Sequence, residues 1–272
     1  WPLFAEPSSG ARGGNQVITD YAELLSTPLA EKIQRVVVFG KPTLNRSVVN
    51  LISNQHEITV VGSRYGNFDI ADNAKQFEAV TAIGSADAAW LAEWKTEAKS
   101  ANDSRQQLIT KIWEKTSIED NVYLGASKMI RVADSVASAK GIKVFSNRGL
   151  AGIDGSVSTA IGIAMNTSGI TRAIIGDLTA IHDLGGMNLS GMDVKNLQLW
   201  VVNDDGGKIF EQLEVKQEVS AEVFDKYFQT PQQVSFEKIS RAMGWNYELI
   251  ESEQDIDHGL DLEGPVLIEF RP

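Results

Sequence analysis

Two short apolar runs, each closed by a carboxylate and glycine, limit most strongly how this chain folds. They are Ile174-Ile175-Gly176-Asp177-Leu178 and Val201-Val202-Asn203-Asp204-Asp205-Gly206-Gly207. An apolar run of roughly four to eight residues that ends in turn residues is typical of a buried strand in a parallel sheet. Ligands of open α/β sheets bind just beyond the carboxyl ends of such strands. We therefore predict an α/β fold in which the two runs are neighbouring strands, with Asp177 and Asp204 side by side.

A pair of carboxylates in this position favours a divalent cation. Mg²⁺ prefers carboxylate and carbonyl oxygens, keeps several waters and usually takes phosphate oxygens for the rest of its shell. The two runs together therefore predict a metal-bridged diphosphate site. For either run alone, an ordinary strand-to-loop turn is the alternative, since Asn-Asp-Asp-Gly-Gly at 203–207 is good turn chemistry.

A glycine-rich segment, Ser146-Asn-Arg-Gly-Leu-Ala-Gly-Ile-Asp-Gly155, precedes a run of small residues at 156–165 that we expect to be helical. Glycines allow the backbone to approach a ligand closely, and the N–H groups at a helix N-terminus attract phosphate. The spacing Gly149, Gly152, Gly155 differs from both the dinucleotide-binding fingerprint and the P-loop. The segment predicts a phosphate contact, and a simple surface turn is the alternative.

Charge and composition exclude several classes of partner. The net charge of −11 over 272 residues disfavours nucleic acid and anionic membrane surfaces, so an anionic ligand needs local help from arginine. The sequence contains no cysteine and no long apolar stretch, which excludes disulfides, thiolate ligands and membrane insertion and favours a cytoplasmic location. The polar stretch 99–104 predicts a boundary between domains 1–104 and 105–272.

Hydrophobic patterning predicts alternating strands and helices along both domains. Arg131 lies off the apolar stripe of its helix and can point at the crevice beyond the strands. We expect Arg46 to be a solvated surface arginine and His182 a loop histidine. The other expected strands are 1–4, 35–39, 57–61, 122–124, 144–145 and 266–270, and the expected helices are 21–25, 46–52, 86–98, 105–115, 128–139, 156–165, 208–213 and 236–243.

Gly176-Asp177 followed by Asp204 and Gly206 resembles the metal-binding motif of thiamine-diphosphate-dependent enzymes, Gly-Asp-Gly followed one strand later by Asn. Within that group, 146–160, Gly176-Asp-Leu-Thr-Ala-Ile-His-Asp183 and 202–210 are similar to the synthase family of menaquinone biosynthesis. The similarity covers most of 105–272 and extends more faintly through 39–46. It implies a parallel-sheet diphosphate-binding domain preceded by a partial central α/β domain.

The resemblance also implies roles for individual residues. Asp177, Asp204 and the Gly206 carbonyl would bind Mg²⁺, with Mn²⁺ as an alternative, and the metal would hold the cofactor diphosphate. Ser127, Arg131 and Arg148 match residues that meet substrate carboxylates. Ile209, Phe210 and Leu213 would form an apolar wall. The remaining residues expected around the cofactor are Arg148, Gly149, Gly152, Ile153, Asp154, Gly155, Gly176, Leu178, Thr179, Gly207 and Ile209.

The implied reaction is decarboxylation of 2-oxoglutarate and addition of the succinyl carbanion to isochorismate, in a homodimer or homotetramer. The resemblance places this chain in the C-terminal half of such an enzyme, without the pyrimidine-binding domain and its cofactor-activating glutamate. We therefore expect the isolated chain to be inactive. The alternatives are another thiamine-diphosphate carboligase similar to acetolactate synthase, or a non-catalytic cofactor-binding module.

The sequence departs from the general motif at two positions, Leu178 for the second Gly and Asp204 for the Asn. Asp204 adds a negative charge beside a diphosphate, which Mg²⁺ and Arg148 would have to offset.

Overall fold

The structure is a computed structural model that describes residues 1–54, 57–62, 69, 72, 74–81, 87–95 and 101–272. The chain forms two compact units, one of Trp1–Glu6 with Gly14–Lys99 and one of Pro7–Gly13 with Ser100–Pro272. Each contains a sheet in which all strand pairs are parallel, which confirms the predicted α/β class. The assignment of domains 1–104 and 105–272 to a central and a diphosphate-binding domain stays a prediction.

The first unit has a three-stranded sheet of β1 (Val36–Phe39), β2 (Ile58–Val61) and β3 (Lys75–Phe77), in that order. Its helices are α1 (Tyr21–Leu24), α2 (Arg46–Asn54) and α3 (Ala88–Trp94). The expected strand at 1–4 is only a single bridge between Leu3 and Val17. The helix expected over 86–98 begins at Ala88, because the Asp87 carboxylate accepts the N–H groups of Ala89 and Trp90. Residues 86 and 96–98 lie outside the described part.

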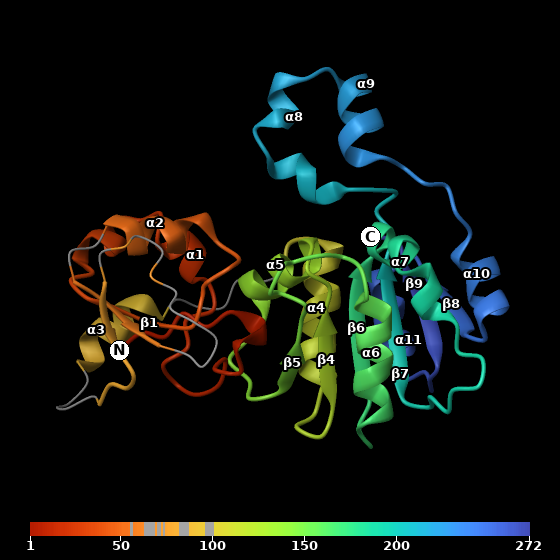
Figure 1. The fold of residues 1–272 in the computed structure, drawn as a ribbon, viewed down its shortest axis with the longest axis horizontal. Coiled ribbons are helices and arrows are strands. Elements are labelled where there is room, and N and C mark those ends of the chain that lie inside the picture. Colours follow the sequence, from red (N-terminus) through yellow and green to blue (C-terminus); the bar gives the residue numbers. More distant parts are fainter. Residues whose placement is uncertain (55–56, 63–68, 70–71, 73, 82–86, 96–100) are drawn as a thin grey trace. The chain divides into compact units, whose positions relative to one another are not determined.

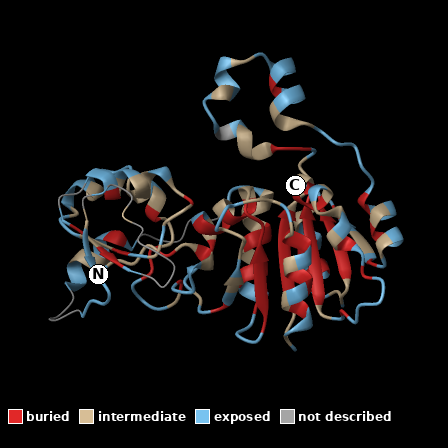
Figure 2. Cartoon of the chain, in the orientation of Figure 1, coloured by how far each residue is buried: buried red, intermediate tan, exposed pale blue. Residues whose placement is uncertain are grey.

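The second unit has a six-stranded sheet in the order β5-β4-β6-β7-β9-β8. The middle strands β6, β7 and β9 are near-continuous apolar runs because both faces of the sheet are covered, and Figure 2 shows these strands buried along almost their whole length. The strands are β4 (Asn121–Leu124), β5 (Lys143–Phe145), β6 (Thr171–Gly176), β7 (Leu197–Val202), β8 (Asn246–Ile250) and β9 (Val266–Phe270).

Helices lie on both faces of this sheet (Figure 1). Leu199 and Val201 of β7 pack in one core cluster with residues of α6 (Ser156–Met165), α7 (Asp177–His182) and α10 (Phe236–Met243). Trp200, between them, points to the opposite face and lies against α11 (Ile256–Leu260). The helices α4 (Ser104–Lys115) and α5 (Lys128–Val136) pack against one another, and α11 packs against α4.

The register places the ends of β6 and β7 at the same level. Gly176 pairs with Val202, so Asp177 and Asn203 are the first residues beyond the paired strands. After β4 the chain passes to β5 on one side of the sheet and then to β6 on the other, so the strand order reverses between β4 and β6. Ligands of doubly wound sheets bind at this kind of switch point, beyond the carboxyl ends of the strands. The neighbouring strand ends predicted from the sequence are confirmed.

A helical excursion leaves the carboxyl edge of the sheet between Gly207 and Gln229 (Figure 1). It consists of the 3₁₀ turn η4 (Lys208–Gln212), α8 (Val215–Glu218), α9 (Ala221–Phe224) and the π-turn η5 (Asp225–Gln229). Its two ends meet at the sheet, where the Gly207 N–H donates to the Gln229 carbonyl at 2.7 Å. In the described part of the chain, no helix is both long and apolar enough to cross a membrane.

Candidate functional site

Asp177 is the best-defined member of the predicted site. It is the first residue of α7 and is only 4% exposed. Its Oδ1 accepts the Leu178 N–H at 2.8 Å and its Oδ2 accepts the Gly206 N–H at 2.6 Å. Burial raises the pKa of Asp177 to about 6, against the backbone hydrogen bonds from Gly206 and Leu178 and with the help of the negative charges of Asp204 and Asp205. The site therefore concentrates negative charge that a cation would relieve.

Asp204 is paired with an arginine that the sequence pattern does not single out. The Arg105 Nε lies 3.0 Å from Oδ1 and 3.2 Å from Oδ2 of Asp204, and the Arg105 Nη2 also donates to Oδ1. The two side chains are 18% and 9% exposed. Arg148 was the offsetting cation expected from the sequence, whereas the ion pair found in the structure is with Arg105.

The loop from Asn203 to Gly206 is held from two directions. Asn203 donates from Nδ2 to the buried carboxylate of Glu269 at 2.8 Å, and its Oδ1 accepts the Asp205 N–H at 3.1 Å. Gly206 has φ +118°, a backbone conformation that residues with a side chain rarely adopt, and its N–H donates a hydrogen bond to the Asp177 carboxylate. Glu269 thus supports the loop that carries Asp204 and Gly206.

The residues present fit a divalent cation chemically. Asp177 and Asp204 follow neighbouring strand ends and interact electrostatically, and the Gly206 backbone lies against Asp177. Two carboxylates and a backbone carbonyl are hard oxygen donors of the kind Mg²⁺ takes when phosphate supplies further ligands. The described residues include no cluster of three or more Asp, Glu or His side chains able to hold a metal. The candidate ligands here are therefore two carboxylates and one backbone carbonyl.

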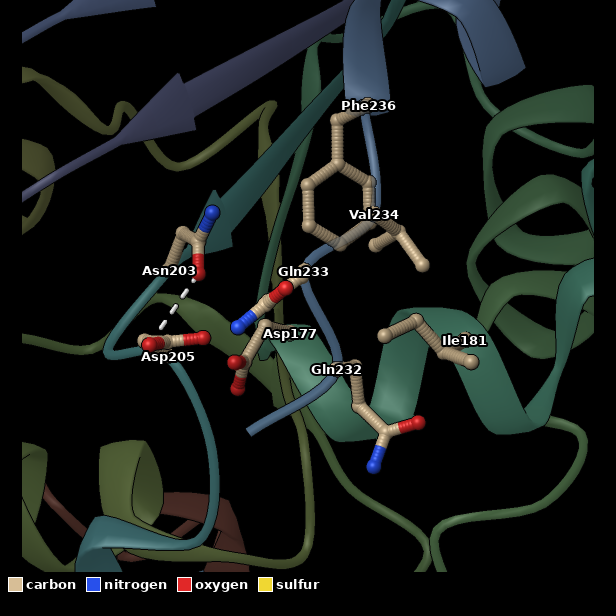
Figure 3. Close-up of a pocket in the computed structure, with 8 residues that line it drawn as sticks. All are labelled: Asp177, Ile181, Asn203, Asp205, Gln232, Gln233, Val234 and Phe236. Atoms are coloured by element: carbon tan, nitrogen blue, oxygen red, sulfur yellow. Dashed lines mark hydrogen bonds between the residues drawn. The ribbon is translucent and has the colours of Figure 1, made fainter. Parts of the chain in front are cut away.

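Figure 3 shows a small pocket into which the Asp177 side chain points. Asn203 and Asp205 border it from the β7 loop, and Gln232 and Gln233 border it from the segment that leads into α10. Gln232 and Gln233 were not expected at the site, because nothing in their spacing ties them to a strand end. The pocket is lined by Asp177, Ile181, Asn203, Asp205, Gln232, Gln233, Val234 and Phe236.

The N-terminus of α6 differs from the expectation of open N–H groups. Gly155 precedes this helix with φ +64°, and the glycine-rich segment leads into it as predicted. The N–H groups of Val157 and Ser158, however, donate to the Asp183 carboxylate at 2.7 and 3.2 Å. The Asp183 carboxylate therefore already accepts hydrogen bonds from two of the N–H groups at the helix N-terminus where the sequence predicts a phosphate contact.

The three residues expected to meet substrate carboxylates lie around one turn. Ser127 directly precedes α5, and the Arg131 Nη1 donates to the Ser127 carbonyl at 2.8 Å. The Arg148 Nη1 lies 3.5 Å from the carbonyl of Ala126. Two guanidinium groups thus converge on consecutive carbonyls at the end of β4, at the same sheet edge as Asp177.

The expected apolar wall lies in the helical excursion. Ile209 and Phe210 belong to η4, and Leu213 follows it with 37% exposure. Phe210 packs edge-on against Phe228, with ring centroids 6.1 Å apart. The three residues therefore share one segment that begins directly after Gly207.

The other residues expected around the cofactor differ in how far they are buried. Gly149 and Asp154 are exposed, Thr179 and Gly207 are buried, and Gly152, Ile153, Gly155, Gly176 and Leu178 are intermediate.

A scan against models of protein families finds no match. Curated relatives do match along nearly the whole chain, and several of them are 2-succinyl-5-enolpyruvyl-6-hydroxy-3-cyclohexene-1-carboxylate synthases. The synthase of Clavibacter michiganensis subsp. michiganensis is 33% identical over 97% of this chain and 54% of its own length. That of Renibacterium salmoninarum is 34% identical over 99% of this chain and 53% of its own length. That of Kineococcus radiotolerans is 35% identical over 90% and 48%.

The chain belongs to this synthase family. It spans about half the length of the curated relatives it matches. The resemblance deduced from the strand-end motifs is thereby confirmed at the level of the family. The roles of individual residues in the synthase site stay predictions.

The raised pKa of Asp177 predicts how the stability of the folded protein changes with pH. Because folding raises this pKa from 3.8 to about 6, the folded protein holds the proton more tightly than the unfolded chain does. Without metal, the free energy of unfolding should fall by up to about 3 kcal/mol as pH rises through this interval and level off above it. Urea unfolding of the protein and of Asp177→Asn, measured from about pH 4 to 7.5, checks this. A wild-type stability that rises relative to Asp177→Asn over that range would contradict it.

Proposed function

We propose that this chain binds thiamine diphosphate through a magnesium ion held by Asp177, Asp204 and the Gly206 carbonyl. The whole protein would then perform the synthase reaction of menaquinone biosynthesis. The observation that carries the proposal is the buried Asp177 carboxylate at the end of β6, joined by a hydrogen bond to the loop that follows β7. Family membership supports the same reading.

Each residue of the site has a proposed task. Asp177 and Asp204 would supply anionic oxygens to the metal, and the segment from Gly149 to Gly155, with Leu178 and Thr179, would hold the diphosphate. Ile153 would pack against the cofactor. Ile209, Phe210 and Leu213 would exclude water from the reacting end of the cofactor. Mn²⁺ would occupy the same position, because it accepts the same oxygen ligands.

The proposed substrates are 2-oxoglutarate and isochorismate, both of which carry more than one carboxylate. Arg131 and Arg148 suit such anions because a guanidinium binds a carboxylate through two parallel hydrogen bonds. Their convergence on the Ala126 and Ser127 carbonyls supports this assignment over a pyruvate-specific carboligase similar to acetolactate synthase. In a chain with a net charge of −11, local cations of this kind are required to attract an anionic substrate.

Thiamine diphosphate supplies the electron sink for decarboxylation when it is bound. The side chains of the protein would bind and orient the cofactor and the substrates and would exclude water from the site. Arg131, Arg148 and Ser127 would orient the carboxylates of 2-oxoglutarate and then of isochorismate, so that the four carbons left after decarboxylation join the second substrate. The inactivity expected of these 272 residues alone, and the assembly into a homodimer or homotetramer, stay predictions.

Thermal unfolding with added ligands tests the proposal. Mg²⁺ and thiamine diphosphate together should raise the melting temperature by about 5 °C or more at saturating concentrations, because a ligand that binds only the folded state stabilises it. Mg²⁺ with thiamine, which has no diphosphate, serves as the control and should give a much smaller shift. Equal shifts with thiamine and thiamine diphosphate, or no shift with either, would refute the proposed site.

A further inference from the structure

Arg105 is the cation that the described part of the site pairs with Asp204. It contacts both carboxylate oxygens, with its Nε at 3.0 and 3.2 Å from Oδ1 and Oδ2 and its Nη2 donating to Oδ1 as well. Ninety-nine positions separate the two residues along the chain. The pair therefore joins the start of α4 to the loop after β7, and it depends on the tertiary fold.

The position of Arg105 is unfavourable in its own helix. It lies in the first turn of α4, directly after the Asp103 N-cap and Ser104. The N-terminal end of a helix carries partial positive charge, which disfavours a cation there. The side chain is also largely withdrawn from water, with 18% exposure. Both costs are offset by the Asp204 carboxylate, so the contact with Asp204 accounts for an arginine at this position.

Several charged side chains lie within electrostatic range of Asp204. Asp177 lies close enough to Asp204 and Asp205 for both to raise its pKa. The pKa of Lys128 is lowered by burial and by the positive charge of Arg105, while the negative charges of Asp204 and Glu211 act to raise it. Asp204 thus interacts electrostatically with Asp177 and with Lys128, and Arg105 is the cation hydrogen-bonded to it.

We propose that the Arg105 guanidinium is a resident counter-ion of the metal site, which neutralises Asp204 while no divalent cation is bound and is displaced from one of its oxygens when one binds. This inference rests on the proposed metal site. It makes Arg105 a positioning residue that sets the affinity of the site for a divalent cation. The charge of Asp204, in place of the amide usual in the motif, is then balanced within the protein.

Two measurements on the full 272-residue chain test the proposal, with Arg105→Met, Asp204→Asn and the double variant. Without metal, Arg105→Met should lower the melting temperature by about 4–8 °C, because an unpaired carboxylate is left partly buried. The same change in the Asp204→Asn background should lower it much less. With Mn²⁺ alone, followed by the electron paramagnetic resonance signal of the free ion, Arg105→Met should bind about tenfold more tightly than wild type.

Lys115→Met is the matched control, because it removes one positive charge from the same helix about 15 Å further along. It should leave Mn²⁺ affinity unchanged. Equal or weaker Mn²⁺ binding by Arg105→Met, while wild type binds, would overturn the role of Arg105 and leave the metal site standing. If neither protein binds Mn²⁺, both the metal site and the inference fall, whereas binding by Arg105→Met alone supports the inference.

Discussion

Asp177→Ala is expected to abolish binding of Mg²⁺ and thiamine diphosphate, with an affinity loss of more than about 100-fold. Loss of a residue that only supports a metal ligand already lowers metal affinity roughly 10–100-fold, and Asp177 would be a ligand itself. Its carboxylate is buried at the end of β6 and is held in place by the Leu178 and Gly206 N–H groups. Isothermal titration calorimetry of the chain with thiamine diphosphate in excess Mg²⁺ measures the loss.

Asp204→Asn should behave differently and keep cofactor binding. Its side-chain oxygen remains available to the metal, and the change releases Arg105 from its ion pair. The freed guanidinium can then attract the diphosphate, which compensates for the lost carboxylate charge. The sequence alone leads to the same expectation, although there Arg148 and the metal balance the charge.

Asp177→Asn separates ligation from folding in this comparison. It removes the charge that burial disfavours, but its single side-chain oxygen can accept only one of the N–H groups of Leu178 and Gly206. These two effects oppose one another, so without metal its melting temperature should stay close to that of the wild type, and with metal it should bind poorly. Equal losses of cofactor affinity in Asp177→Ala and Asp204→Asn would contradict the assignment of Asp177 as the dominant ligand.

Gly206→Ala is expected to have the second large effect, on both stability and metal binding. The φ of +118° costs a side-chain-bearing residue at least about 1–3 kcal/mol. A Cβ at this position would also overlap the backbone carbonyl of Gln229, at the base of the helical excursion. The loop must therefore shift, which withdraws the Gly206 N–H from Asp177 and moves the carbonyl proposed for the metal. Urea unfolding and Mn²⁺ binding measure the two effects.

Gly162→Ala is the control for this change. Gly162 lies within α6, and a Cβ there meets no atom within 4 Å. It should stabilise the protein by about 0.5–1 kcal/mol, because alanine favours a helix interior over glycine. If Gly206→Ala retained wild-type stability and Mn²⁺ affinity, the close packing of this loop against Gln229 would not matter for the site.

The sheet and the meeting of its strand ends could be predicted because they depend on local pattern. Buried parallel strands are continuous apolar runs, so β6, β7 and β9 are visible in the sequence. The residues that follow each run must then lie at the carboxyl edge, so Asp177 and the loop that carries Asp204 follow neighbouring strand ends. Strand β3, by contrast, is exposed along its length, and its pattern gives no such signal.

The partners of the site residues could not be predicted, because they come from distant segments. Arg105 meets Asp204 across 99 positions, and Asp183 reaches the N–H groups of Val157 and Ser158 from the far end of α7. Neither pairing has a local sequence pattern. An arginine in the first turn of a helix, against the helix dipole, is the one signal that points to a special role for Arg105.

The position of a bound Mn²⁺ tests the central claim most directly. Crystals of the protein grown with Mn²⁺ and thiamine diphosphate should give an anomalous scattering peak bonded to oxygens of Asp177 and Asp204, the Gly206 carbonyl and the cofactor diphosphate. Metal-to-oxygen distances should be about 2.0–2.3 Å, as for small divalent cations with oxygen ligands. A peak bound to other residues, or a diphosphate held without any metal at Asp177, would contradict the account.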